Sequence, residues 1–176
     1  MLTLKEKTSE DSQIRDVGLI SDTHVPTRAK KIPLKVFEVF KNAAYIVHAG
    51  DLVQLEVIDE LEQIAPVLAV YGNMDGIDVR GRLLPINTLK VYDWKIGVLH
   101  GSDLLFSGKM HKIAEENNFH ALVYGHTHRP SIKWEGGILL INPGSPTNPL
   151  PPFITKPTVG MLRITTEKLD PEIVTI

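Results

Sequence analysis

The sequence predicts an α/β fold built on two packed β-sheets. Three observations lead to this prediction: strand-like and helical segments alternate up to about residue 85, short β-rich runs follow one another closely after it, and ligand-type side chains stand where strands end. A chain of 176 residues fits one domain with a single core.

The first half of the chain has the order strand, helix, strand, helix, strand. Apolar runs over residues 17–20, 45–49 and 67–71 indicate strands, and apolar residues at helical spacing over 33–44 and 52–64 indicate helices between them. This order is typical of a parallel sheet, in which ligands bind at the carboxyl ends of the strands.

The second half is rich in short strands and predicts a mixed second sheet packed on the first. One helix is expected over residues 107–118, and turns at Trp94-Lys95 and at 135–137 would form hairpins. The proline-rich stretch 142–157 predicts a loop. The predicted strands cover residues 89–92, 96–99, 121–124, 131–134, 138–141 and 159–164.

Composition narrows the classes of function. The chain has no cysteine, so any bound metal is held by nitrogen and oxygen, and its formal net charge of −2 gives no signal of nucleic-acid binding. It has no apolar stretch of the ~20 residues that cross a bilayer and no secretion signal, so we expect a cytoplasmic protein without a membrane partner. Residues 1–16 are predicted to be a flexible N-terminal extension before a single domain over 17–176, and a homo-oligomer is compatible with the sequence.

Five short signatures carry the chemistry, and each follows a predicted strand. Aspartate and histidine side chains at strand ends are common components of metal sites. The signatures are Asp22-Thr23-His24, Gly50-Asp51, Gly72-Asn73, His100-Gly101 and Gly125-His126-Thr127-His128.

Together the signatures offer enough ligands for two ions. The outer residues of Asp22-Thr23-His24 and of His126-Thr127-His128 would point the same way if the backbone stays extended, and the lone carboxylate of Asp51 is of the type that bridges two metals. A ligand set that combines imidazole and carboxylate groups suits Mn, Fe, Ni, Co or Zn better than Mg or Ca. The candidate ligands are Asp22, His24, Asp51, Asn73, His100, His126 and His128.

The ordered set D-x-H, G-D, G-N, H-G and G-H-x-H resembles the calcineurin-like metallophosphoesterases, and Asn142-Pro143-Gly144-Ser145 extends the match. Length and motifs are most similar to the small prokaryotic phosphodiesterase branch, which is related to the small scaffold subunit of the retromer complex. The resemblance implies a sandwich of two β-sheets flanked by helices, the αββα metallophosphoesterase fold.

The resemblance also implies an activity and a role for each ligand. It implies a phosphodiesterase that hydrolyses a small phosphodiester by attack of a metal-bound hydroxide, with two divalent ions, Mn or Ni first and Zn, Fe or Co as further options. Asn73 and His100 would also contact the phosphoryl group. By position, Asp22, His24, Asp51 and His128 would hold the first ion, and Asp51, Asn73, His100 and His126 the second.

Two departures from the family pattern matter. Many relatives read Gly-Asn-His-Asp or Gly-Asn-His-Glu, where this chain has Met74, and a thioether cannot donate a proton to a leaving group. Esters of acidic alcohols or phenols are therefore the expected assay substrates. Ser102-Asp103 follows His100-Gly101 where a second histidine is often seen in this branch.

Several alternatives remain open at this level. Asp75 is a candidate to orient Asn73 or a ligating histidine, and His48 is either a core histidine or a support beside Asp51. The segment from Asn142 to Ser145 is either a plain turn or part of the active-site rim. Two other functions fit the chain, namely a phosphomonoesterase or nucleotidase using the same site, and a non-catalytic protein-binding scaffold.

Overall fold

The computed structural model describes residues 14–103, 109–149 and 156–176. Strand β1 (Arg15–Ile20) begins two residues before the predicted start at Val17. Most of the predicted N-terminal extension, residues 1–13, lies outside the described residues.

The first sheet has the strand order β10-β9-β1-β2-β3. Strands β1, β2 and β3 run parallel, as the alternation of strands and helices predicted, while β9 is antiparallel to β1 and β10 is antiparallel to β9. All three parallel strands therefore end at one edge of the sandwich. Besides β1, the sheet contains β2 (Tyr45–Ala49), β3 (Val67–Val70), β9 (Thr158–Ile164) and β10 (Leu169–Thr175).

The second sheet has the order β4-β5-β6-β8-β7 and is mixed, as expected. Strands β5, β6 and β8 are parallel, and β4 and β7 pair with this core as antiparallel edge strands. The strands are β4 (Ile86–Val91), β5 (Trp94–Leu99), β6 (Ala121–Val123), β7 (Ser131–Glu135) and β8 (Ile138–Asn142).

One predicted turn is wrong and the other is confirmed. Trp94 pairs with Val91 inside the β4–β5 hairpin, so the turn consists of Tyr92 and Asp93 and not of Trp94-Lys95. Apolar Trp94 continues the strand because it packs against the core between the sheets. The β7–β8 turn is closed by Gly136 and Gly137, whose φ values of +56° and +82° suit a two-residue hairpin.

Four helices lie in the described residues, of which three were predicted over longer ranges. These are α1 (Leu34–Phe40), α2 (Glu56–Glu62) and α4 (Lys109–Glu116); residues 107 and 108 of the third prediction lie outside the described residues. Helix α3 (Ile77–Arg82) was not predicted, because its only buried residue is Val79 and it has no apolar stripe.

Strand β10 was also not predicted from the sequence. It contains Pro171 and alternates polar residues with apolar ones, and it pairs only with β9. A proline is tolerated in such an edge strand because its missing N–H costs no ladder hydrogen bond.

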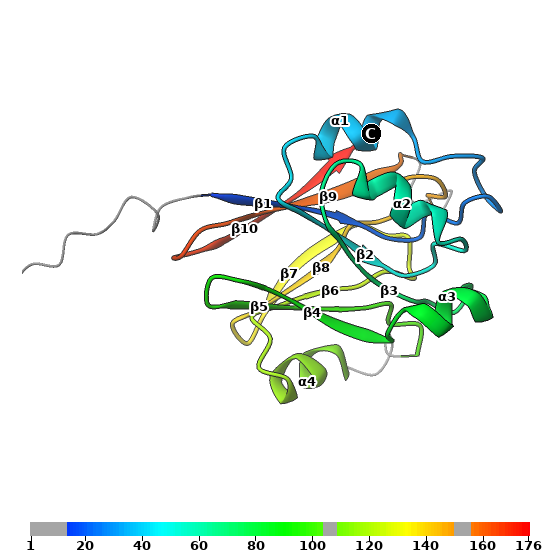
Figure 1. The fold of residues 1–176 in the computed structure, drawn as a ribbon. Coiled ribbons are helices and arrows are strands. Elements are labelled where there is room, and N and C mark those ends of the chain that lie inside the picture. Colours follow the sequence, from blue (N-terminus) through cyan, green and yellow to red (C-terminus); the bar gives the residue numbers. More distant parts are fainter. Residues whose placement is uncertain (1–13, 104–108, 150–155) are drawn as a thin grey trace, which may run out of the picture.

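The two sheets pack face to face, and helices cover their outer faces (Figure 1). An apolar cluster that includes Leu19, Val47, Val98 and Ile141 fills the space between the sheets. A second cluster lies under α1 and α2, and a third lies under α4. The fold is thus the predicted α/β two-sheet sandwich flanked by helices. No helix in the described ranges is both long and apolar enough to span a bilayer.

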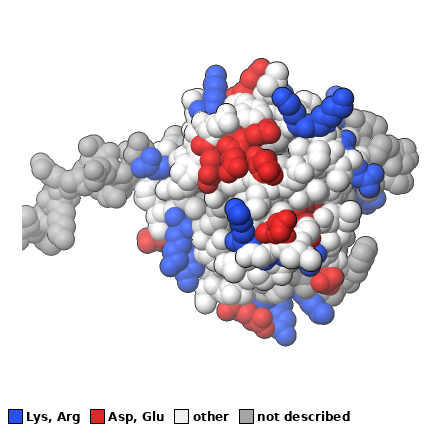
Figure 2. Space-filling view, turned by 45° about the vertical axis from the view of Figure 1, so that its right-hand side comes forward, with Lys and Arg blue, Asp and Glu red and all other residues white. Residues whose placement is uncertain are grey.

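Charged side chains of both signs lie on the face seen in Figure 2. Acidic side chains form one contiguous group in its upper middle, and lysines and arginines stand singly or in small groups around it. This pattern agrees with the nearly balanced composition of 19 basic and 21 acidic residues.

Candidate metal centre

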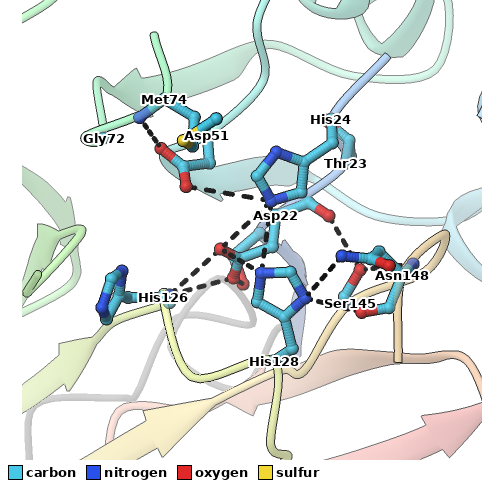
Figure 3. Close-up of polar contacts among 12 residues, drawn as sticks. Asp22, Thr23, His24, Asp51, Gly72, Met74, His126, His128, Ser145 and Asn148 are labelled. Carbon is cyan, nitrogen blue, oxygen red and sulfur yellow. Dashed lines mark hydrogen bonds and ion pairs between the residues drawn. The ribbon is translucent and has the colours of Figure 1, made fainter. Parts of the chain in front are cut away.

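Two clusters of potential metal ligands meet where the parallel strands end. Loops after β1, β2, β5 and β6 bring their side chains together, and the donor atoms within each cluster lie within 4.8 Å of one another. Figure 3 shows the side chains of Asp22, His24 and His128 facing one another, with the Asp51 carboxylate beside His24. Cluster A consists of Asp22, His24 and His128, and cluster B consists of Asp51, His100 and His126.

Cluster A joins the loop after β1 to the loop after β6. His128 Nε2 lies 3.4 Å from Asp22 Oδ1, and His24 Nε2 lies 4.0 Å from the same oxygen. The two Nε2 atoms are 3.2 Å apart. One carboxylate and two imidazoles therefore converge on a small volume, as metal ligands do.

Cluster B is extended by Asn73, which the loop after β3 supplies. His100 Nε2 lies 3.2 Å from Asp51 Oδ2, and Asn73 Oδ1 lies 3.0 Å from both His100 Nε2 and His126 Nδ1. All seven ligand candidates from the sequence thus meet at one edge of the sandwich.

Asp51 lies between the clusters. Its Oδ2 is 3.2 Å from His100 Nε2 in cluster B and 3.8 Å from His24 Nε2 in cluster A. Gly72 permits this placement, because a Cβ there would overlap the Asp51 carboxylate and the His100 ring. The Asp51 carboxylate is therefore close to imidazole nitrogens of both clusters.

The backbone at the ligands differs from the extended conformation considered for the sequence. Five ligand residues have left-handed φ values between +44° and +69°: Asp22, His24, Asp51, His126 and His128. Such conformations cost about 1 kcal/mol or more each in a non-glycine residue. The side chains converge because the chain turns sharply after each strand, and not because they share one face of an extended strand.

Hydrogen bonds hold these turns in place. The His126 amide N–H donates to both carboxylate oxygens of Asp22, at 3.1 and 3.0 Å, and Ser21 Oγ donates to Asp22 Oδ2 at 2.7 Å. Gly125 is required beside this contact, because a Cβ at that position would lie 2.7 Å from Asp22 Oδ2. The Asp22 carboxylate thus connects the loop after β1 to the loop after β6, which carries His126 of cluster B and His128 of cluster A.

The histidine orientations fit a bound cation. His100 Nδ1 donates to the carbonyl of Ala49 at 2.8 Å, and His128 Nδ1 donates to the carbonyl of Asn148 at 2.6 Å. In the neutral tautomers that make these bonds, each Nε2 carries a lone pair and faces carboxylate oxygen. Such a convergence of lone pairs is stabilised by a proton or by a metal ion, so the donor set suits divalent transition metals.

The pKa values show the same electrostatic preference. Burial lowers the pKa of His100, but its hydrogen bond to Asp51 and the charges of Asp22 and Asp51 outweigh burial and raise the pKa overall. Burial raises the pKa of Asp51, but the hydrogen bond and charge of His100 bring it below its ordinary value. At this pair the electrostatics thus favour positive charge next to the carboxylate, whereas burial lowers the pKa of His24 and His126.

Asp75 supports the centre in a way that differs from the prediction. Its carboxylate accepts hydrogen bonds from the backbone N–H groups of Gly72, Asp51 and Val53, at 2.7, 2.9 and 2.6 Å. Burial raises its pKa, although these N–H donors offset part of the effect. Asp75 therefore positions the turns that carry Asp51 and Asn73 through their backbone, and not through the side chain of Asn73 or a histidine.

His48 is completely buried, and its Nε2 lies 3.1 Å from Thr23 Oγ1. The His48 side chain thus hydrogen-bonds the loop that carries Asp22 and His24. Desolvation by burial lowers its pKa from 6.5 to about 4. The imidazole is therefore neutral in the folded protein at neutral pH.

His48 makes folding sensitive to acid. Between pH 6.5 and 4 the unfolded chain binds a proton at this residue more readily than the folded protein. As the pH falls through this window, His48 should lower the free energy of unfolding by about 3 kcal/mol, at ~1.4 kcal/mol per pKa unit. Urea unfolding of the metal-free protein and of His48→Gln from pH 7 to 4 tests this, since Gln can still hydrogen-bond Thr23. Equal losses of stability in the two proteins would exclude the effect.

Arg80 in α3 is a supporting residue that sequence reasoning missed. Its Nε donates to the carbonyl of Asp75 at 2.7 Å, and its Nη2 donates to the carbonyls of Gly72 and Asn73 at 3.1 and 3.0 Å. These bonds hold the turn that presents Asn73. A lone arginine in an unpredicted helix gave no signal in the sequence.

The segment from Asn142 to Ser145 was left open as a turn or as part of the rim. Together with the residues up to Asn148, it packs against both loops of cluster A. Asn142 Nδ2 donates to the carbonyl of Gly125 at 2.9 Å, and Ser145 Oγ donates to the carbonyl of Asp22 at 2.8 Å. Asn148 contributes the carbonyl that orients His128. The segment thus fixes the ligand loops, and Asn148 was not singled out because its contribution is a backbone atom.

Met74 stands at the position where many relatives carry histidine. Its backbone N–H donates to Asp51 Oδ1 at 2.8 Å, and the residue is 53% exposed. The position therefore supports Asp51 through the backbone but offers no titratable group near the clusters. Ser102 and Asp103 line a cleft that begins at Asn73 and His100.

The two-sheet fold and the two ligand clusters are the features of a metallophosphoesterase. A family model for the calcineurin-like phosphoesterase superfamily domain matches residues 16–167. The chain belongs to this superfamily, as its motifs indicated.

Relatives agree with this assignment. The chain is 42% identical over 165 residues to a protein of Methanothermobacter thermautotrophicus named "Probable metallophosphoesterase", covering 90% of this chain and 91% of that one. It is 31% identical over 162 residues to a phosphodiesterase of Methanocaldococcus jannaschii, covering 83% and 91%. The structure of Vacuolar Protein Sorting 29 from Cryptosporidium parvum shares the fold, with a TM-score of 0.77, 21% identity and coverage of 93% and 98%.

Proposed function

We propose that this protein is a phosphodiesterase that depends on two divalent metal ions. The observation that carries the proposal is the placement of Asp51 Oδ2 between the two ligand clusters, 3.8 Å from His24 Nε2 and 3.2 Å from His100 Nε2. A relative that is 31% identical and named a phosphodiesterase supports the choice of activity.

The proposed ligand sets follow the two clusters. Asp22, His24, Asp51 and His128 would hold one ion, and Asp51, Asn73, His100 and His126 the other. Bound metals of this kind lower the pKa of a water molecule and polarise a phosphoryl group for in-line attack. The chain then needs no protein nucleophile.

The residues of the chain would bind and orient the substrate. Asn73 and His100 border the cleft beside cluster B, and we expect them to contact phosphoryl oxygens. No general acid stands at Met74, so the leaving group departs without a proton from that position. We expect Mn or Ni as the resident metals, with Zn, Fe or Co as further options, and the expected cytoplasmic location stays a prediction.

The proposed activity makes a prediction about leaving groups. The metal-loaded protein should hydrolyse an aryl phosphodiester in the presence of Mn²⁺ or Ni²⁺, and a chelator should abolish this turnover. Replacing a phenol leaving group by an alkyl alcohol should slow the reaction by at least the ~10²–10⁴ that a general acid typically contributes. Steady-state kinetics with a series of diesters measures this dependence. Turnover that persists after chelation, or that is indifferent to the leaving group, would contradict the proposal.

The alternatives from the sequence can be tested in the same assay. A phosphomonoesterase or nucleotidase would use the same ligands but would prefer aryl monoesters over diesters. A non-catalytic scaffold would show no metal-dependent turnover of either ester. The seven filled ligand positions favour an enzyme over a scaffold, and Met74 favours a diesterase with good leaving groups.

A further inference from the structure

A cleft of about 630 Å³ begins at Asn73 and His100 and runs away from cluster A. Its walls come from the β3–α3 turn, from the start of β4 and from α4. Cavities of roughly 300–1,000 Å³ hold small organic ligands in proteins. The cleft therefore has the size and place to hold the organic part of a substrate whose phosphate lies at the clusters.

The lining of the cleft is mainly apolar. Tyr71, Ile86, Leu99 and Ile113 are among the residues that line it. At the same cleft, Asn117 donates from Nδ2 to the carbonyl of Ile113 at 2.8 Å, which fixes its amide group. A ligand group with apolar faces and a hydrogen-bonding edge matches this combination better than a bare alkyl chain does.

Charge in the cleft is balanced and does not suit a second phosphate group. Besides His100, the charged residues of its described lining are Arg80 and Asp103. The guanidinium of Arg80 lies 5.2 Å from the centre of the Tyr71 ring, and its Nε and Nη2 already bind backbone carbonyls. With one fixed arginine and one opposing carboxylate, the cleft favours a neutral group.

We propose that this cleft binds a nucleoside, so that the substrate is a phosphodiester in which one ester group is a nucleoside. The inference rests on the proposed phosphodiesterase function and specifies its substrate. The base is neutral, its faces are apolar, and its edge carries the donors and acceptors that the Asn117 amide can bind. The phosphate of such a substrate would lie next to Asn73 and His100.

Two substrates with the same leaving group test the proposal. Thymidine 5′-(4-nitrophenyl) phosphate carries the nucleoside, and methyl 4-nitrophenyl phosphate lacks it. Asn117→Trp and Ile113→Trp fill the cleft from its exposed end and from its wall. Each should lower kcat/KM for the thymidine ester at least about tenfold, mainly through KM, and leave the methyl ester unchanged. Ile77→Trp, at a 90% exposed position of α3 outside the cleft, is the matched control and should alter neither.

A second readout separates this inference from the proposed function. Thymidine 5′-monophosphate should bind the metal-loaded protein, and Asn117→Trp should weaken this binding, as measured by calorimetry. If neither ester is hydrolysed but this pattern of binding holds, the activity is wrong and the nucleoside site stands. Equal effects of the cleft variants on both esters would overturn the proposal. So would monophosphate binding that the cleft variants leave unchanged, or a failure of every form of the protein to bind the monophosphate.

Discussion

We expect Asp51→Asn to lower kcat/KM for an aryl phosphodiester by roughly 10³-fold or more. Asn has nearly the same shape and retains one oxygen, so the Met74 N–H keeps an acceptor, but the charge that both clusters share is lost. Steady-state kinetics with added Mn²⁺ measures the loss. Elemental analysis of the same samples should show fewer bound ions per chain.

Asp59→Asn is the matched control, because Asp59 is an exposed carboxylate on α2. It should leave both activity and metal content unchanged. Full activity of Asp51→Asn, with normal metal content, would contradict the shared role of Asp51.

Asp75→Ala should destabilise the protein by about 3 kcal/mol or more, since it leaves three backbone N–H groups without their acceptor at ~1–3 kcal/mol each. The affected amides belong to Asp51, Val53 and Gly72, so the turns that carry Asp51 and Asn73 should also loosen. Urea unfolding of the metal-free variant measures the stability. A titration with Mn²⁺ should show weaker binding as well.

The control for this change is Asp78→Ala, which removes an exposed carboxylate three residues further along. Its stability should stay within about 0.5 kcal/mol of the unmodified protein, as is usual for surface substitutions. If Asp75→Ala lowered the stability as little as Asp78→Ala, the hydrogen bonds of Asp75 would not be responsible for holding these turns.

Strong periodic patterns made much of the fold predictable. The parallel strands β1, β2 and β3 are apolar runs, because helices and a second sheet bury both of their faces. Elements without such a pattern were missed: α3 buries only Val79, and β10 is an edge strand interrupted by Pro171. The turn before Trp94 was misplaced because its residues carry no glycine and Tyr92 takes a positive φ of +53°.

The ligand candidates were predictable because each follows a strand end, and strand ends of parallel sheets meet. Their local conformation was not, since tertiary hydrogen bonds such as that from the His126 N–H to Asp22 hold the left-handed turns. The residues that hold the ligand loops in place could not be predicted from the sequence either. Arg80 acts through carbonyls of a distant turn, and Asn148 acts through its own carbonyl, so side-chain chemistry in the sequence does not reveal either role.

The proposed metal centre requires that two metal ions share Asp51. Electron paramagnetic resonance of metal-free protein reloaded with Mn²⁺, together with elemental analysis, tests it most directly, because ions that share a carboxylate about 4 Å apart are magnetically coupled. We expect two ions per chain with a coupled spectrum, and loss of the coupling in Asp51→Asn. One ion per chain, or two ions with uncoupled signals, would contradict it.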